Sequence, residues 1–149
     1  MSASDAQALA ERLVASMLEG DAFSRWLGVE LVALRPGACT LRMTVRAEMA
    51  NGFGVCHGGV TFSLADSALA FASNTHGSVT MSVDNAITYP APAHVGDVLV
   101  ASAEEEGAAG PLAFYRVVVR REDGPAVALF RGTVYRTRRE LLPERASDE

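Results

Sequence analysis

The polar and apolar positions of this chain follow two different periods, and the change falls at Val29. Residues 4–19 place apolar side chains at helical spacing, with Ser4 as a candidate N-cap and Gly20 at the end of the run. Residues 21–27 predict a second, shorter helix. From Val29 the chain predicts two strands joined by a proline–glycine turn, and in the second strand apolar and polar residues alternate, which is typical of a half-buried strand.

A glycine-rich loop, residues 51–59, precedes the one long segment that is apolar on nearly all sides. This segment, residues 60–73, is rich in alanine and leucine and has no proline or glycine, which predicts a buried helix. Four strand-like segments follow, each bounded by proline or glycine: residues 79–89, 97–107, 112–122 and 126–140. Their short connections favour an antiparallel sheet. The expected fold class is α+β, with a curved antiparallel sheet wrapped around one buried helix in a single domain, residues 1–149.

Composition narrows the class of protein. The chain has 149 residues, 49% of them hydrophobic and 21% charged, which is typical of a globular domain. No apolar run approaches the roughly 20 residues of a membrane-spanning helix, and the N-terminus lacks the pattern of a signal peptide. Two cysteines make no disulfide framework, so we expect a cytoplasmic protein. A net charge of -5 argues against nucleic acid as a partner.

The positive charge is concentrated in one part of the chain. All 13 basic residues are arginines, and residues 111–139 contain seven of them against two acids. A local basic patch on an acidic protein favours a small anionic ligand over a polyanion. A solvated strand face that carries arginines for solubility would give the same pattern, so both interpretations stay open.

Asp66 is the most informative single residue, because it lies in the middle of the apolar helix. A buried carboxylate without partners is costly, so Asp66 needs a partner, a raised pKa or a chemical role. At helical spacing it shares a face with Ser63, Ser67, Ala70 and Asn74, the only polar stripe on this helix. Asp66 is therefore a structural residue held by hydrogen bonds, or a general base or nucleophile in an apolar groove.

The loop before this helix suggests a complementary group. His57-Gly58-Gly59 leads into the helix N-terminus, where free N–H groups and the positive end of the dipole can stabilise an oxyanion. Gly58 and Asp66 are about 12 Å apart along one helix, too far to reach the same carbonyl carbon. If both act, two copies of the chain must share each site, with Gly58 of one copy near Asp66 of the other.

Other candidate chemistry is weaker. Asn51 could donate its side-chain N–H to a carbonyl oxygen or orient a water, or it could simply shape the turn before Gly52. Cys56 and His57 are sequence neighbours, which seldom gives the geometry of a nucleophile–base pair. The three histidines and two cysteines have no metal-ligand spacing, and no nucleotide-binding or nucleophile-elbow motif occurs.

Taken together, these motifs resemble a known family. Asn51, His57-Gly58-Gly59 and the helix segment Phe62–Ala68 around Asp66 are similar to the hotdog-fold acyl-CoA thioesterases of the phenylacetic-acid-degradation (PaaI-like) type. The resemblance continues through residues 82–97 and 128–133 and covers roughly residues 23–136. It implies an acyl-CoA substrate, no metal and no cofactor besides the CoA of the substrate, and a homodimer with shared sites that pairs into a homotetramer.

The resemblance also implies roles for individual residues. Asp66 would be the general base or nucleophile, the Gly58 N–H would polarise the thioester carbonyl of the facing subunit, Asn51 would hold the carbonyl or the water, and Ser82 would place the water. CoA would lie along the outer side of the sheet and at subunit edges. The remaining candidates for substrate or CoA binding are His57, Gly59, Phe53, Ser67, Asp84, Asn85, Arg131 and Arg136.

One position departs from the family pattern. Phe53 stands where phenylacetyl-type members often have histidine, which puts the acyl preference in question. Two other activities stay open from the sequence: a non-catalytic acyl-CoA-binding protein, and a hotdog hydratase or dehydratase. A hydratase would need a histidine paired with an acid across the dimer, whereas the helix acid here holds the thioesterase position.

Overall fold

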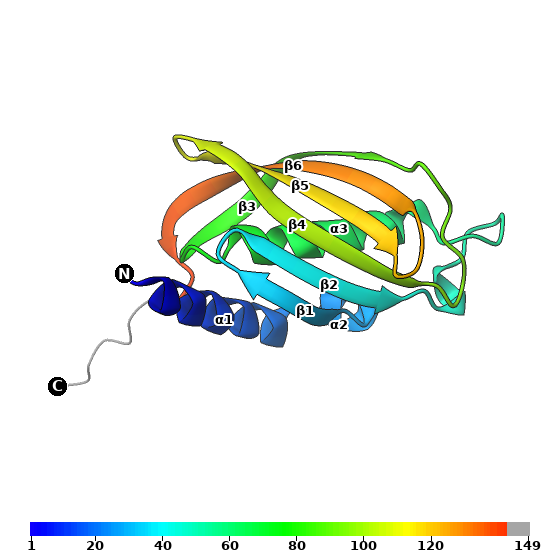
Figure 1. Ribbon diagram of the computed structural model, residues 1–149, viewed down its shortest axis with the longest axis horizontal. Coiled ribbons are helices and arrows are strands. Elements are labelled where there is room, and N and C mark those ends of the chain that lie inside the picture. Colours follow the sequence, from blue (N-terminus) through cyan, green and yellow to red (C-terminus); the bar gives the residue numbers. More distant parts are fainter. Residues whose placement is uncertain (143–149) are drawn as a thin grey trace.

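A computed structural model describes residues 1–142 of the chain. Figure 1 shows a strongly curved sheet that wraps one long helix, α3, with a second long helix, α1, beside β1. The elements in chain order are α1 (Ala3–Gly20), α2 (Ala22–Leu27), β1 (Glu30–Arg35), β2 (Ala38–Thr44), the 3-10 turn η1 (Ala47–Met49), α3 (Gly58–Ser73), β3 (Ser78–Thr88), β4 (Val98–Ala109), β5 (Leu112–Arg121) and β6 (Ala126–Glu140). The predicted α+β hotdog architecture is confirmed. Most of the charged tail that we expect from about residue 140 lies outside the described residues.

The N-cap of the first helix lies two residues earlier than its pattern predicts. Ser2, not Ser4, is the N-cap of α1: the Ser2 hydroxyl accepts the Asp5 N–H at 3.1 Å, and the Asp5 carboxylate accepts the Ser2 N–H at 3.2 Å. This reciprocal capping box satisfies two helix-terminal donors, which the Ser4 side chain in the first turn cannot do.

The six strands form one antiparallel sheet in the order β1-β2-β4-β5-β6-β3. β4, β5 and β6 follow one another as hairpins, as their short connections predict. β3 is the exception, because it pairs with β6 at the sheet edge rather than with β4. Residues 89–97, which include two prolines, carry the chain from β3 back across to β4.

The core lies between α3 and the inner face of the sheet. Along β5 the residues Ala113, Tyr115, Val117 and Val119 are buried, and their neighbours in sequence point outward. On β6 the inward position Gly132 leaves room for α3: a Cβ there would lie 2.6 Å from Leu69 Cδ2. Close-packed interiors do not absorb such an overlap without a shift of the helix. The glycine therefore sets how closely α3 approaches the sheet.

The edge strand β3 is open in the single chain. Its residues 81–84 are exposed on both faces, with Met81 58% and Val83 59% accessible. An edge strand leaves a row of backbone donors and acceptors unpaired, and natural proteins rarely leave apolar side chains beside such an edge. This edge is therefore a candidate interface.

Candidate active site

The first turn of α3 has one backbone donor without a partner. His57 is the N-cap: its Nδ1 accepts the Gly59 N–H at 2.9 Å, and its carbonyl oxygen accepts the Val60 N–H at 2.9 Å. Among residues 1–142 the Gly58 N–H donates to no protein group. Because Gly58 is also the first residue of a 16-residue helix, this N–H lies at the positive end of the helix dipole. His57 and Gly59 shape the turn, and Gly58 supplies its free donor.

Tyr89, at the end of β3, holds this turn from the other side. Its hydroxyl donates to the Gly58 carbonyl oxygen at 2.7 Å, and a Cβ on Gly58 would lie 3.2 Å from the tyrosine Cζ and Oη. A hollow of about 320 Å³ opens beside this contact, lined mainly by small apolar residues of the loop before α3 and of the 89–93 segment. Sequence reasoning gave Tyr89 no role. The signal for it is the tight space at Gly58, where a Cβ would press against the Tyr89 ring.

Asp66 lies two turns further along α3, on the side not covered by the sheet. It is half-buried, as are Ser63 and Ala70 on the same stripe, and within residues 1–142 its carboxylate has no hydrogen-bond or salt-bridge partner. Burial, and next the negative charge of Asp21, raise the pKa of Asp66 above its ordinary value. A half-open carboxylate with a raised pKa and no structural partner is suited to accept a proton or to attack a carbonyl.

Two residues of the predicted polar stripe turn away from Asp66. Ser67 is buried, and its Oγ lies 2.8 Å from Ser24 Oγ of α2. Asn74 is buried at the C-cap, where its amide bridges the Ala70 and Thr80 carbonyl oxygens. Ser67 is therefore not placed to bind substrate, contrary to expectation. The helix turns these positions toward α2 and β3, partners that a helical wheel does not reveal.

Asn51 is fixed with its amide donors free. Its Oδ1 accepts two backbone N–H groups, from Phe53 at 2.9 Å and from Val55 at 3.3 Å. Both interactions fix the orientation of the amide, and its NH₂ has no partner within residues 1–142. The loop that Asn51 organises presents Phe53 at its tip, 92% exposed. One chain thus holds a free side-chain donor and a free aromatic ring on the same loop.

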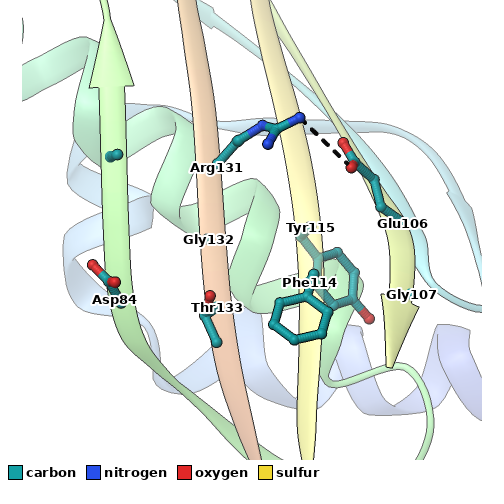
Figure 2. A pocket seen from close by; sticks show the side chains of 9 residues that line it. Asp84, Glu106, Gly107, Phe114, Tyr115, Arg131, Gly132 and Thr133 are labelled. Atoms are coloured by element: carbon teal, nitrogen blue, oxygen red, sulfur yellow. Dashed lines mark ion pairs between the residues drawn. The ribbon is translucent and has the colours of Figure 1, made fainter. Parts of the chain in front are cut away.

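Asp84 and Asn85 lie on opposite faces of the sheet, although we expect both beside one pocket. Ser82 Oγ donates to Asn85 Oδ1 at 2.8 Å, and a Cβ on Gly132 would lie 2.8 Å from the same oxygen, so Asn85 faces the side of α3. Asp84 instead lines an outer-face hollow of about 430 Å³ with Glu106 and Arg131 (Figure 2). Adjacent residues of a strand point to opposite faces, so alternation along β3 already separates Asp84 from Asn85. The β-bulge between Ser82 and Asp84 explains why Ser82 and Asn85, three residues apart, meet on the same face.

The two arginines predicted to hold phosphates differ in their availability. Arg131 projects from β6 on the outer face with its side chain 78% exposed, and its nearest acid is Glu106 at 3.9 Å (Figure 2). Arg136 is only 27% exposed and is ion-paired with Glu105, which also contacts His76 at 3.0 Å. Arg136 is therefore occupied by a structural ion pair and is not free to bind phosphate.

Other chemistries find no support among the described residues. Cys56 Sγ contacts the His57 carbonyl oxygen and Thr61 Oγ1, not the imidazole, and burial raises the pKa of this thiol. Both cysteines are free. Over residues 1–142 no three histidine, cysteine or acidic side chains gather as they would around a metal ion. In the same range no helix combines the length and apolar character that crossing a membrane requires.

Comparisons with known proteins agree with this geometry. The family model of the thioesterase superfamily matches residues 53–128. The acyl-coenzyme A thioesterase PaaI of Escherichia coli is 36% identical over 121 residues, which cover 81% of this chain and 86% of the relative. Human acyl-coenzyme A thioesterase 13 is 34% identical over 125 residues, 81% of this chain and 89% of that protein. The solved structure of the E. coli PaaI protein superimposes with a TM-score of 0.87 at 33% identity and covers 90% of this chain and 97% of its own.

Proposed function

Because this chain belongs to the thioesterase superfamily and is an acyl-CoA thioesterase, we propose that it hydrolyses aryl-acyl-CoA thioesters through Asp66 and Gly58. One observation carries the assignment of residues. A single helix holds a backbone donor at its positive end and a half-buried carboxylate in its middle, and neither has a partner within residues 1–142. These are the two groups that thioester hydrolysis needs, an oxyanion donor and a base or nucleophile.

The chemical steps follow from those groups. The thioester carbonyl oxygen accepts the Gly58 N–H, with the Asn51 amide as a second donor, so negative charge can develop on that oxygen. Asp66 takes a proton from a water held by Ser82, and the water oxygen bonds to the carbonyl carbon. The tetrahedral intermediate then releases the CoA sulfur, which leaves with the proton, and the free acid remains. In the alternative route the Asp66 oxygen attacks first, and water resolves the mixed anhydride.

If Gly58 and Asp66 both act on one substrate, each site uses two chains. Gly58 and Asp66 are about 12 Å apart along α3, so one carbonyl cannot contact both from the same helix. We propose a homodimer in which the open stripes of two α3 helices face each other in opposite directions. The exposed β3 edge, with Met81 and Val83, supports an interface at this side of the molecule. Pairing of two such dimers into a homotetramer is part of the same proposal.

The relatives support an aryl-acyl substrate. The E. coli PaaI protein is described as coming from the phenylacetic acid degradation operon. It is 33% identical to this chain, and the match covers 90% of this chain. In the present chain an aromatic ring, Phe53, projects from the loop that carries Asn51. An aromatic side chain beside the reacting centre favours a planar acyl group by ring stacking.

A panel of CoA thioesters tests this preference. We expect kcat/KM for phenylacetyl-CoA and hydroxyphenylacetyl-CoA to exceed that for straight-chain thioesters of similar size by about tenfold. Release of free thiol measures the rate. Phe53→Ala should reduce the difference between aryl and straight-chain substrates, whereas Phe23→Ala, an exposed ring on α2, serves as the control. Equal rates across the panel would contradict the proposed preference.

Arg131 is the proposed ligand of a CoA phosphate. Its direct cross-strand neighbour on β5 is Arg116, and Glu106 lies 3.8 Å from Arg116 and 3.9 Å from Arg131, so one carboxylate faces two arginines and a net positive charge remains. Both line a second outer-face hollow of about 420 Å³ whose other residues include Val118 and Leu129 and no acid. A phosphate bound there would neutralise the arginine pair.

Arg131→Gln should therefore raise KM for a CoA thioester by about three- to tenfold and leave kcat unchanged, because a phosphate contact stabilises ground state and transition state equally. Arg12→Gln, an exposed arginine on α1, is the matched control. Steady-state kinetics with CoA and dephospho-CoA thioesters show which phosphate is involved. An unchanged KM with both substrates would place CoA elsewhere.

A further inference from the structure

A second carboxylate, on the short helix α2, is held beside the segment of α3 that contains Asp66. Asp21 is the N-cap of α2, where its Oδ1 accepts the Ser24 N–H at 2.9 Å and its Oδ2 accepts the Ser24 hydroxyl at 2.6 Å. Ser24 Oγ lies 2.8 Å from Ser67 Oγ, and both serines are buried. Neither the sequence motifs nor the proposed chemical steps give Asp21 or Ser24 a role.

The proton positions along this chain of groups follow from the donors available. An ionised carboxylate can only accept, so the single Ser24 hydroxyl proton goes to Asp21. Ser24 Oγ must then accept from Ser67, whose hydroxyl proton points toward α2. Two hydrogen bonds, from Ser67 to Ser24 and from Ser24 to Asp21, therefore connect the neighbour of Asp66 on α3 with the N-cap of α2. The serines are buried, and hydrogen bonds are stronger in the protein interior than in water.

The other end of α2 is fixed as well. Arg46 donates to the Leu27 carbonyl oxygen at 3.0 Å and to the Trp26 carbonyl oxygen at 2.7 Å, and its guanidinium lies 5.0 Å from the centre of the Trp26 ring. Gly28, in the left-handed region, then ends the helix. A helix of six residues would be unstable alone, yet here it is held at both ends and in the middle.

We propose that Asp21 is a positioning residue for the thioesterase reaction: α2, anchored through Ser24 and Ser67, holds a second negative charge where it acts on Asp66. This inference rests on the proposed role of Asp66. A like charge nearby disfavours ionisation, and the charge of Asp21 is, after burial, the cause of the raised pKa of Asp66. Asp21 thereby keeps Asp66 a stronger base than an isolated aspartate.

The other charged groups around α3 lie further from Asp66 or pair with one another. His57 lies nine residues before Asp66, about 13 Å along the helix, and the Glu105–Arg136–His76 cluster contacts the residues beyond its C-terminal end. Arg46 lies at the opposite end of α2 from Asp21. Arg25, on α2 itself, is exposed. On or beside the strands, seven charged residues pair with one another at the surface: Arg35, Arg42, Glu104, Glu106, Arg116, Glu122 and Arg131.

The test is the pH profile of kcat/KM for Asp21→Asn. Asparagine can still cap α2 through its Oδ1 but carries no charge. The acid limb is the part of the profile where kcat/KM rises as Asp66 loses its proton. We expect this limb to move to lower pH by about 0.5 to 1 unit in the variant. The plateau of kcat/KM at high pH should fall roughly threefold, because Asp66 becomes a weaker base. The variant is then more active than wild type at low pH and less active at high pH. A purely structural role would scale the whole profile down without moving the limb, and that result would overturn the inference.

Two further measurements make the outcome unambiguous. Ser24→Ala removes the hydroxyl link but keeps both carboxylates, the cap bond from the residue-24 N–H to Asp21 and the Arg46 contacts that fix the other end of α2, so its melting temperature should fall while the acid limb stays in place. If Asp21→Asn does not fold, Asp21→Ser keeps a capping oxygen without charge. Carbon-13 NMR titration of the Asp66 carboxyl group reports its pKa without any assay of activity. An unchanged pKa in the variant refutes the action of Asp21 on Asp66. A lowered pKa with an unmoved acid limb instead refutes Asp66 as the base, and with it the proposed function.

Discussion

Asp66→Asn is expected to lower kcat by about a thousandfold, because a positioned general base or nucleophile contributes on the order of 10² to 10⁴ in rate. The substitution keeps the size of the side chain and removes only its charge and basicity. KM should change little, since the carboxylate is not proposed to bind CoA. Free-thiol release in single turnovers measures the effect, with Asp123→Asn in the exposed β5–β6 turn as the matched control. A variant that keeps more than about a tenth of wild-type kcat would rule out Asp66 as the base.

The same substitution should not destabilise the fold, which separates a chemical effect from unfolding. The raised pKa of Asp66 means that between its ordinary and its raised value the folded chain binds more protons than the unfolded chain. The free energy of unfolding therefore falls as pH rises through that window, and the loss is complete above the folded-state pKa. Asparagine cannot ionise, so at pH 7.5 the variant should melt at the same or a higher temperature than wild type. A melting temperature several degrees lower would assign the lost activity to structural damage.

The second large loss of activity is expected for Gly58→Pro. This substitution removes the Gly58 N–H, which has no partner within residues 1–142, and keeps the backbone hydrogen bonds of α3. Proline is tolerated at the first position of a helix, and the preceding residue, His57, already has the extended conformation that proline requires, with φ -59° and ψ 132°. Loss of one oxyanion donor typically lowers kcat by about 100- to 1,000-fold.

Gly58→Ala is the matched control for this variant. It adds the same Cβ against the Tyr89 ring but keeps the N–H. The ratio of the two kcat values therefore isolates the donor from the crowding. If alanine and proline lower kcat equally, the damage comes from contact with Tyr89, and the Gly58 N–H is not the oxyanion donor.

Mixing the two inactive variants extends this experiment to the shared site. If each site takes Asp66 from one chain and Gly58 from the other, a dimer of one Asp66→Asn chain and one Gly58→Pro chain contains one intact site and one doubly altered site. Random exchange of subunits at equal concentration should then restore about a quarter of wild-type activity. If both residues act within one chain, no mixture recovers activity.

The fold could be predicted because its elements depend on local pattern. Residues 112–122 alternate between apolar and polar, and in the structure they form a strand with one face in the core. The apolar run after Gly59 forms the buried helix that it predicts. The position of β3 could not be predicted, because its pairing with β6 depends on a connection that crosses the sheet and not on the strand itself.

In the candidate site, too, some features could be predicted from the sequence and others could not. Asp66, Gly58 and Asn51 could be proposed from the sequence, because a carboxylate stands out in an apolar helix and the glycine and the asparagine precede it in one glycine-rich loop. Ser67 and Arg136 were expected to contact substrate, but Ser24 and Glu105, distant in sequence, engage them. Which partner a polar side chain finds is decided by tertiary packing, and one-dimensional spacing does not contain that information.

The open edge of β3 also has a consequence for the single chain before it finds a partner. A newly folded chain exposes an unpaired strand with Met81 and Val83 on it, a surface that can pair with any other extended segment. The neighbouring Asp84, which takes no part in the proposed chemistry, adds a charge to this strand. Charges on exposed edge strands disfavour edge-to-edge aggregation, so Asp84→Val is expected to increase aggregation of the newly made chain.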